Sequence, residues 1–435
     1  MKLIELTPES KSRLLEDLLM RSPSHYQVYA ERVQAILDRV REEGDAALFD
    51  YTRQFDGADI NAGNIEVTSE EIEEAYTKVP ADLLATMRRS AENIRHFHQL
   101  QKRNSWFQTT EDGTILGQKI TPLRRAGVYV PGGTAAYPSS TMMNILPAKV
   151  AGVTEIIMIT PPGKDGKINP ATLVAASEAG ADRIFKAGGA QAIAALAFGT
   201  ESVPKVDKIV GPGNIYVALA KKAVYGYVSI DSVAGPSEVL VLADDTADVD
   251  YVAADLLSQA EHDKLASAIL VTPSLELAKK VGERAWQMAK ELPRREIIED
   301  SLNRYGYLLV TKDLAEAIEV ANDIASEHME ILTANPFEVM TKIRNAGAIF
   351  LGPYSSEPLG DYYAGPNHVL PTNQTAKIFS PLGVDDFIKK SSIIYYSEEA
   401  LRAASQDIIR FAQAEHLDAH ANSIRVRFPD REEQD

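Results

Sequence analysis

Two stretches of the sequence decide the fold: RIFKAGGAQAIAALAFG at residues 183–199 and DKIVGPGNIYVALAKKAV at residues 207–224. Each starts with a short apolar run that favours a β-strand, turns at glycine, and continues as an alanine-rich segment that favours a helix. RAGVYVPGG at residues 125–133 and EIIMITPPG at residues 155–163 have the same texture. This alternation is typical of βαβ units around a parallel sheet. We therefore expect an α/β domain in this region.

The same pattern returns in the second half of the chain. Four strand-like runs follow one another, and each but the last precedes a helix-like segment: SEVLVLADD, SAILVTPS, YGYLLVTKD and AGAIFLGPY. We expect a second α/β domain, which meets the first near Gly235. After about Phe379 the sequence favours helices again, and this tail is too short to form a core of its own.

The first hundred or so residues favour helices. Thr7 can cap a helix that has Pro8 at its first position, and Thr68 stands three residues before Glu71, the spacing of a capping box. The amphipathic run that starts there extends to about Lys102. These signals predict a helical N-terminal segment.

Composition limits the class of partner. The chain has 435 residues, 45% of them apolar, enough for two or three packed domains. A formal net charge of −17 argues against nucleic acid or an anionic membrane as partner, since phosphate binding needs clustered Lys and Arg. The N-terminus has no apolar signal core, and no segment is long and apolar enough to cross a bilayer. We expect a cytoplasmic protein that acts on a small molecule.

Cysteine is absent. Disulfides, thiolate zinc sites and thiol nucleophiles are therefore excluded. Any metal ion must be held by nitrogen and oxygen atoms, and any aldehyde oxidation must proceed without a thiohemiacetal.

Three glycine turns follow predicted strands in the first α/β domain: Gly132-Gly133, Gly188-Gly189 and GPGN at residues 211–214. Such turns bring backbone N–H groups to a helix start, where phosphate is favoured. None matches G-x-G-x-x-G, because Tyr216 stands where the third glycine belongs. A nucleotide site and ordinary tight turns both explain the pattern.

The polar residues with metal-binding chemistry lie mostly in the second half. Gln259 stands three residues before His262, so a helix would place both side chains on one face. Asp361 and His368 lie in a Gly- and Pro-rich loop just after the strand AGAIFLG, where α/β sheets carry their ligands. A solvated helix end or a turn explains each residue taken singly. Their joint occurrence with three glycine turns favours a functional site.

The remaining histidines carry weaker signals. His416 and His420 stand four apart, the spacing of many chelating pairs. His96 and His98 stand two apart and would face different ways on a helix, so we expect surface or core histidines there, and also at His25.

Several long motifs resemble the histidinol dehydrogenase family, from about residue 25 to about residue 427. They occur in the family's order: GVYVPGGTAAYPSSTMMNILPAKVAGV, GGAQAIAALAFGTESVPKVDKIVGPGN, AGPSEVLVLAD, DLLSQAEHD, SEHMEI, NAGAIFLGPYSSEPLGDYYAGPNHVLPT and FSPLGVDDFIKKSSI. The resemblance implies an α/β fold of two incomplete Rossmann-like α/β/α domains, over residues 126–234 and 235–380, without the usual glycine fingerprint. It also implies an N-terminal helical segment, 1–125, packing with the second domain, and a C-terminal helical tail, 381–435, intertwined in a homodimer.

The resemblance further implies an activity and a set of site residues. The activity is oxidation of L-histidinol to L-histidine through L-histidinal, with two NAD+ and one Zn2+ per subunit. By this resemblance the zinc ligands are Gln259, His262, Asp361 and His420, and the acid–base pair is Glu327 and His328. The substrate contacts are Ser237, His328 and Glu415, together with the four metal ligands. The NAD contacts are Tyr129, Gln191 and Asn214.

The chemistry of these residue types agrees with the roles. Removing a hydride from an alcohol requires a base for the hydroxyl proton, which suits His328, and hydrating the aldehyde requires a general base, which suits Glu327. Glu415 and His420 would lie about 140° apart on an ideal helix, so they need a break in that helix or separate sites. We expect His420 as the ligand and His416 at the surface. A zinc hydrolase and a nucleotide-binding protein without chemistry remain alternative functions.

Overall fold

The computed structural model describes residues 1–21, 27–132 and 137–428; His25 and Gly133 lie outside the described residues. The chain forms two compact units. The first comprises residues 1–102 and 123–387, and the second comprises residues 103–122 and 388–435. The first unit contains two parallel sheets flanked by helices, as the alternation of strand-like and helix-like runs predicts.

The smaller parallel sheet has the order β6-β5-β4-β7-β8. Its strands are β4 (Arg125–Tyr129), β5 (Glu155–Thr160), β6 (Arg183–Lys186), β7 (Lys208–Val210) and β8 (Ser229–Ile230). The chain starts at the centre, winds outward to β6, and returns to the other side of β4 for β7 and β8, so the direction of winding switches between β4 and β7. In doubly wound sheets a ligand crevice opens at the carboxyl ends of the strands beside such a switch.

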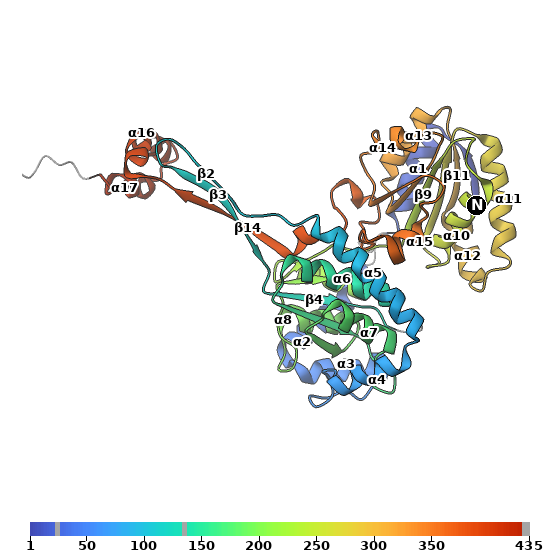
Figure 1. Ribbon diagram of the computed structural model, residues 1–435, viewed down its shortest axis with the longest axis horizontal. Helices are drawn as coiled ribbons and strands as arrows, with labels where there is room; N and C mark the ends of the chain where they lie inside the picture. Colours follow the sequence, from blue (N-terminus) through green and yellow to red (C-terminus); the bar gives the residue numbers. More distant parts are fainter. Residues whose placement is uncertain (22–26, 133–136, 429–435) are drawn as a thin grey trace, which may run out of the picture. The chain divides into compact units, whose positions relative to one another are not determined.

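Helices cover both faces of this sheet. On one face, α8 (Gly189–Phe198) and α9 (Ile215–Val224) form the core with α2 (Gln27–Glu43) and α3 (Asp45–Asp56). On the other face lie α6 (Pro138–Ala151) and α7 (Pro170–Ala179). They are backed by α4 (Ser69–Lys78) and α5 (Ala81–Gln99), and Figure 1 shows α5 running beside α6.

The larger parallel sheet has the order β1-β11-β10-β9-β12-β13. Its strands are β1 (Lys2–Glu5), β9 (Glu238–Ala243), β10 (Ser267–Thr272), β11 (Gly306–Val310), β12 (His328–Leu332) and β13 (Ala348–Leu351). Without β1, the strands follow the same winding as the smaller sheet, with the switch between β9 and β12. Both sheets are therefore versions of one doubly wound design.

Helices also cover both faces of the larger sheet. One face packs against α10 (Val249–Ala260), α11 (Leu275–Ala289) and α12 (Arg295–Tyr305), and the other against α1 (Pro8–Leu19) and α13 (Leu314–Ile324). In Figure 1, α11 lies along one face of the strands. The short helix α14 (Pro336–Met340) connects β12 to β13.

The N-terminal segment differs from the expectation of one helical piece, residues 1–125, that packs with the second α/β domain. Here β1 and α1 join the larger sheet, whereas α2 buries Val33, Leu37 and Val40 in the core of the smaller one. The alanine-rich surface of α8 offers an apolar partner for α2 that local helix signals do not reveal. Residues 103–125 form strands rather than helix.

The predicted helix caps at Thr7 and Thr68 are confirmed, but the predicted end of the helix that starts after Thr68 is wrong. Thr7 caps α1 with Pro8 in its first turn, and Thr68 caps α4 through the predicted capping box with Glu71. The run expected to continue from Thr68 to about Lys102 is interrupted at Val79 and Pro80. Proline lacks an N–H and disfavours helical backbone in the residue before it, so α4 ends and α5 begins on its other side.

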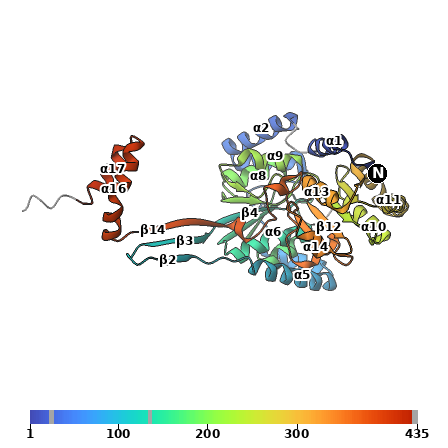
Figure 2. The same cartoon turned by 90° about the horizontal axis from the view of Figure 1, so that it is seen from above.

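The second unit contains an antiparallel sheet and two helices. The strand β3 (Ile115–Pro122) pairs with β2 (Trp106–Thr109) and with β14 (Ile388–Tyr395), and Figure 2 shows the three strands side by side. The helices α16 (Glu398–Ala414) and α17 (Asp418–Arg425) pack on each other. The expected helical tail, 381–435, therefore includes a strand.

A break separates α16 from α17. Glu415 is the C-cap of α16, and His416 has a left-handed backbone, with φ of 59°. Glu415 and His420 can serve one site only if the helix breaks between them, and this break is present. In the part of the chain described, no helix is both long and apolar enough to span a membrane.

Candidate functional site

The main cluster of predicted site residues lies at the amino ends of β9 and β12. Ser237 directly precedes β9, Glu327 directly precedes β12, and His328 is the first residue of β12. Helix α10 connects parallel neighbours β9 and β10, so it runs antiparallel to them and its last turn, with Gln259, returns to their amino ends. His262 follows in the next turn, where its N–H donates to the Gln259 carbonyl at 3.1 Å.

Asp361 reaches this cluster from the opposite end of the sheet. After β13 the chain runs back through α15 (Glu357–Leu359) and the π-helical turn η2 (Gly360–Ala364). The carboxylate of Glu330, on β12, accepts the N–H of Glu357 at 2.8 Å and so ties the returning segment to the sheet. Asp361 Oδ1 then lies 3.7 Å from His328 Nε2. The expected position at the carboxyl end of a strand is thus wrong, because this loop folds back along the sheet.

His368 supports Asp361 from the following loop. Its Nδ1 lies 3.0 Å from the Asp361 carbonyl oxygen, and its Nε2 lies 3.2 Å from Oγ of Ser140. A carbonyl oxygen only accepts, so Nδ1–H donates to it. His368 therefore fixes the backbone that carries the Asp361 carboxylate.

Glu238 holds both members of the predicted acid–base pair. Its backbone N–H donates to Glu327 Oε2 at 2.9 Å, and its carbonyl oxygen lies 3.0 Å from His328 Nδ1. The amide nitrogen of Gln259 also lies 3.3 Å from that Nδ1, but two donors do not bond, and the carbonyl contact is shorter. Nδ1–H therefore points to Glu238, and the neutral ring has its lone pair on Nε2.

Glu238 is itself anchored in the interior. Its side chain pairs with Arg21, which is almost fully buried and also donates to the Leu265 carbonyl at 2.8 Å. Neither Arg21 nor Glu238 lies in a recognisable spacing with the site residues, so the sequence pattern does not reveal them. Arg21 thus ties the start of β9 to the segment before β10 and so steadies the Glu238 backbone that contacts Glu327 and His328.

Burial and neighbouring charges oppose each other at both members of the pair, but the net effect raises the pKa of each. Burial raises the pKa of the Glu327 carboxyl above its ordinary value, and the nearby His328 ring only partly opposes this. Burial lowers the pKa of His328, but the carboxylates of Glu327 and Asp361 outweigh it and raise that pKa above its ordinary value. Both groups therefore bind protons more tightly than they would in water.

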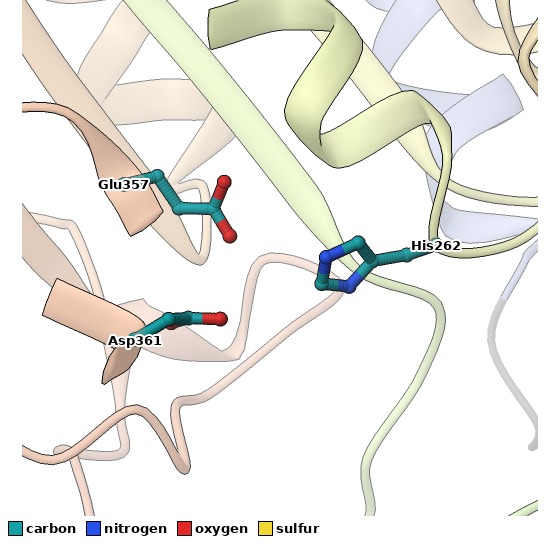
Figure 3. Close-up of side chains that lie close together, drawn as sticks. All are labelled: His262, Glu357 and Asp361. Carbon is teal, nitrogen blue, oxygen red and sulfur yellow. The ribbon is translucent and has the colours of Figure 1, made fainter. Parts of the chain in front are cut away.

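Three residues of the cluster can hold a metal ion. One ligand atom each from His262, Glu357 and Asp361 lies within 4.8 Å of the others, and Figure 3 shows both carboxylates turned toward the imidazole of His262. Gln259 is fully buried, and its Oε1 has no hydrogen-bond partner among the described residues. A nitrogen and two carboxylates within reach of one another fit a divalent cation such as Zn2+, and the unpartnered buried oxygen of Gln259 is a further candidate ligand.

Glu357 is the member of this group that the sequence analysis missed. It stands four residues before Asp361, a spacing that would place both carboxylates on one face of a helix. Ser258 Oγ donates to Glu357 Oε2 at 2.7 Å and orients the carboxylate. The spacing was therefore a usable signal, although a weak one.

The predicted NAD contacts gather at the carboxyl ends of the smaller sheet. Tyr129 ends β4, Gln191 lies in the first turn of α8, and Asn214 is the N-cap of α9. The Gly189 N–H donates to the Tyr129 hydroxyl at 3.2 Å. Asn214 Oδ1 accepts from the N–H of Tyr216 at 3.0 Å, a helix cap that needs no ligand.

One feature of these turns, the unpartnered amide of Gln191, favours a ligand over tight turns alone. Gln191 is 1% exposed, yet neither atom of its amide has a hydrogen-bond partner within residues 1–21, 27–132 and 137–428. Gly211 has φ of 114°, and a Cβ there would lie 2.0 Å from the Tyr129 carbonyl oxygen. Only glycine lets the turn after β7 approach β4 so closely. Burial raises the pKa of Tyr129 to about 12, so its phenol stays neutral.

The last two predicted site residues belong to the second unit. Glu415 follows α16, His420 lies in the first turn of α17, and both side chains are exposed. His416 is exposed and His98 is buried, as expected for surface and core histidines.

A doubly wound sheet with a candidate nucleotide site, and a second sheet with a buried carboxylate–histidine pair beside potential metal ligands, fit the class of NAD-dependent oxidoreductases. Comparison with known proteins gives the particular family. The profile of the histidinol dehydrogenase family matches residues 19–428. The chain belongs to the histidinol dehydrogenase family.

Individual relatives match over almost the full length. Histidinol dehydrogenase from Halalkalibacterium halodurans is 59% identical over 398 residues, which cover 92% of this chain and 93% of the relative. Histidinol dehydrogenase from Caldanaerobacter subterraneus is 54% identical over 427 residues, covering 98% and 99%. The crystal structure of histidinol dehydrogenase from Elizabethkingia anophelis matches with a TM-score of 0.92 at 36% identity and covers 98% of each chain.

Proposed function

We propose that this chain oxidises L-histidinol to L-histidine through L-histidinal, using two NAD+ and one Zn2+ per subunit. The observation that carries the proposal is the orientation of His328, whose Nδ1–H is committed to a carbonyl while Nε2 faces Asp361 beside the potential metal ligands. A base with a fixed lone pair next to cation ligands suits an alcohol that is bound through nitrogen atoms.

In the first oxidation, His328 accepts the hydroxyl proton of the alcohol at Nε2. This atom has no hydrogen-bond partner within the described chain, so it is available to a substrate. The negative charge of Asp361 helps to raise the His328 pKa. Cation binding by Asp361 would offset that charge and lower the pKa of His328. The neutral imidazole would then be populated near neutral pH.

In the second oxidation, Glu327 acts as the base that activates water on the aldehyde. Its buried carboxyl has a raised pKa, so its carboxylate is a stronger base than an exposed one. The chain contains no cysteine, so a hydrate rather than a thiohemiacetal is the species that loses the second hydride. The N–H of Glu238 keeps the carboxylate in place.

The metal ligands are Gln259, His262 and Asp361, with His420 supplied by a second copy of the chain. Zn2+ held there would bind the imidazole and amine of the substrate and so orient the alcohol. The unpartnered Gln259 Oε1 and the close approach of the His262 and Asp361 ligand atoms support this assignment. Ser237, at the amino end of β9, and Glu415 complete the substrate contacts.

Tyr129, Gln191 and Asn214 are assigned to NAD+, which accepts the hydride. Their arrangement at the carboxyl ends of β4, β6 and β7, beside the switch in winding, supports the assignment. The unpartnered amide of Gln191 offers a donor and an acceptor to a bound dinucleotide.

We assign the working unit as a homodimer in the cytoplasm, without nucleic-acid or membrane partners. The second unit exposes large apolar side chains on its strands and helices, including Trp106, Phe107, Ile394 and Phe411. A cluster of this kind in a small unit favours burial against another protein surface. Because Glu415 and His420 lie in the same unit, a second copy is the partner that fits.

One assay tests the proposal against its rivals. The purified protein is incubated with L-histidinol and NAD+, and NADH is followed by absorbance. Two NADH formed per histidinol, with L-histidine as the product, is the expected result. Hydrolysis of an amide or ester without NADH would favour a zinc hydrolase, and NAD+ binding without turnover would favour a nucleotide-binding protein.

A further inference from the structure

A carboxylate outside the assigned site residues lies at the carboxyl end of the smaller sheet. Asp56 is the last residue of α3, a helix that packs on α8. Its carboxylate accepts a hydrogen bond from the backbone N–H of Gly188, in the turn after β6. Its second oxygen, Oδ2, is buried and has no hydrogen-bond partner in the described parts of the chain.

The surroundings of Asp56 place it in the crevice between the strand ends. A Cβ built on Gly188 would lie 2.5 Å from Pro161 Cβ and 3.3 Å from Asp56 Oδ1, so these three residues meet. A Cβ on Gly132, which follows β4, would lie 2.4 Å from Pro161 Cγ. Pro161 itself follows β5. Asp56 therefore lies where the ends of β4, β5 and β6 come together.

The end of the second strand is a ligand-binding position in dinucleotide-binding sheets. In dinucleotide-binding sheets, an acidic residue at the end of the second strand accepts hydrogen bonds from the adenosine ribose, whereas a cation there accommodates a 2′-phosphate. Here the second strand of the sheet is β5, which ends in Thr160 and is followed by Pro161 and Pro162. These residues supply no carboxylate. Asp56 supplies one from a different part of the chain.

A second, independent feature points to a ligand at the same turn. Gly189 has φ of 61°, and its neighbour Gln191 is buried with both amide atoms unpartnered among the residues described. Asp56 and Gln191 thus present unsatisfied polar atoms on the two sides of the Gly188-Gly189 turn. Unsatisfied buried polar atoms are rare unless a ligand or water completes them.

We propose that Asp56 accepts hydrogen bonds from the adenosine-ribose hydroxyls of NAD+ and excludes the 2′-phosphate of NADP+. The inference rests on the proposed function, because it concerns the dinucleotide of that reaction. A carboxylate accepts from two hydroxyls but repels a phosphate dianion. Lys164, in the loop after β5, lies close to this site, because its Cγ would lie 3.6 Å from a Cβ on Gly57, the residue after Asp56. Without the Asp56 charge, Lys164 is available to a 2′-phosphate.

The test compares the binding of NAD+ and NADP+ by calorimetry, together with the rate of histidinol oxidation with each. The variant is Asp56→Asn, which keeps one acceptor for the Gly188 N–H. We expect NAD+ affinity to fall about 10-fold and the preference for NAD+ over NADP+ to fall by about 10- to 100-fold. Asp59→Asn is the matched control, since Asp59 is an exposed carboxylate three residues away, paired with Arg53. The Asp59→Asn protein should keep the wild-type preference for NAD+ over NADP+.

A second variant separates charge from fold. Asp56→Glu keeps the negative charge, so it should still reject NADP+ even if NAD+ binds less tightly. An unchanged preference in Asp56→Asn, or a preference lost equally in Asp56→Glu, would overturn the inference. Wild-type protein that neither binds NAD+ nor oxidises histidinol would instead overturn the proposed function, so the two failures are distinguishable.

Discussion

His328 Nδ1 lies 3.0 Å from the carbonyl oxygen of Glu238, and this contact decides which ring nitrogen can take a proton. The carbonyl cannot donate, so Nδ1 keeps its hydrogen and Nε2 is the basic atom. His328 is the first residue of β12, which lies inside the sheet, and its side chain is almost fully buried. Its orientation is therefore set by the sheet rather than by the substrate.

Replacing His328 by Asn should slow the oxidation of histidinol more than the oxidation of supplied histidinal. Asparagine can still donate to Glu238, but it has no basic nitrogen for the hydroxyl proton. Loss of a general base typically costs about 10²- to 10⁴-fold in rate. The measurement is single-turnover NADH formation from each substrate in turn. Equal losses on both substrates would indicate that His328 only binds the substrate.

Replacing Glu327 by Gln should have the opposite selectivity. Glutamine keeps the shape and can accept the Glu238 N–H, but it cannot activate water, so the histidinal step should slow far more than the histidinol step. Glu338→Gln is the matched control, because Glu338 is an exposed glutamate paired with Lys342. The assignment fails if Glu327→Gln slows both half-reactions alike or resembles the control.

The sequence predicted the two α/β domains because their strands and helices follow local periodicity. β9 and β10, for example, are continuous apolar runs bounded by turn residues, as buried parallel strands should be. It did not predict that Asp361 meets His328 at the amino ends of the strands. That meeting depends on a return path through η2, which has no periodic signature.

Residues whose roles depend on distant contacts were missed for the same reason. Arg21 lies 217 positions from its partner Glu238, and Asp56 lies on a helix far in sequence from the Gly188 turn. Glu357 was missed although its spacing to Asp361 was visible, because carboxylates four apart occur on many solvated helices. Long-range pairing of this kind is set by topology, and local propensity carries no information on it.

Replacing His262 by Asn and Asp361 by Ala together should abolish bound zinc, because the double variant removes two of the potential ligand atoms. The wild-type protein should lose activity on prolonged chelation, and Mn2+ or Co2+ should restore part of it, since all ligands are nitrogen or oxygen. Metal content per subunit, measured by elemental analysis, checks both statements. Full zinc content in the double variant would contradict the ligand assignment.

Glu357→Gln tests the carboxylate that the sequence analysis missed. If Glu357 contacts the ion, its loss should weaken zinc affinity by about 10- to 100-fold, less than the double variant does. Glu276→Gln, an exposed helix glutamate paired with Lys280, is the control and should retain wild-type zinc affinity. An unchanged affinity in Glu357→Gln would limit its role to supporting the segment before Asp361.

Mixing two inactive variants should restore activity if His420 acts on the active site of a second copy. His420→Asn and His262→Asn proteins are each expected to be inactive, because each lacks one metal ligand. After dissociation and reassociation, mixed dimers would contain one site with both defects and one site with neither. About a quarter of wild-type activity is then expected from a random mixture, since half of the dimers are mixed and each has one intact site. Recovery of no activity would place all ligands in one chain.

The stability of the smaller α/β domain should depend on pH through Asp56. Burial raises the pKa of its carboxyl from 3.8 to about 6, although the Gly188 N–H opposes the shift. Between these values the folded chain holds a proton that the unfolded chain has released, so the free energy of unfolding falls as pH rises through this window. Above this window Asp56 is charged in the folded chain, and the full free-energy cost of burying that charge applies. Without solvent screening, the shift from 3.8 to about 6 would correspond to about 3 kcal/mol, and the partial exposure of Asp56 reduces this to roughly 1 kcal/mol.

Replacing Asp56 by Asn removes this dependence. The difference in free energy of unfolding between Asp56→Asn and wild type should therefore shift in favour of the variant by roughly 1 kcal/mol between about pH 4 and about pH 8. The comparison of two pH values matters, because the new amide also introduces a buried donor whose cost does not depend on pH. Urea denaturation, followed without NAD+ at several pH values, measures the difference, and Asp59→Asn controls for the change in net charge. If Asp56→Asn and wild type keep a constant difference across the window, the Asp56 carboxyl does not titrate there.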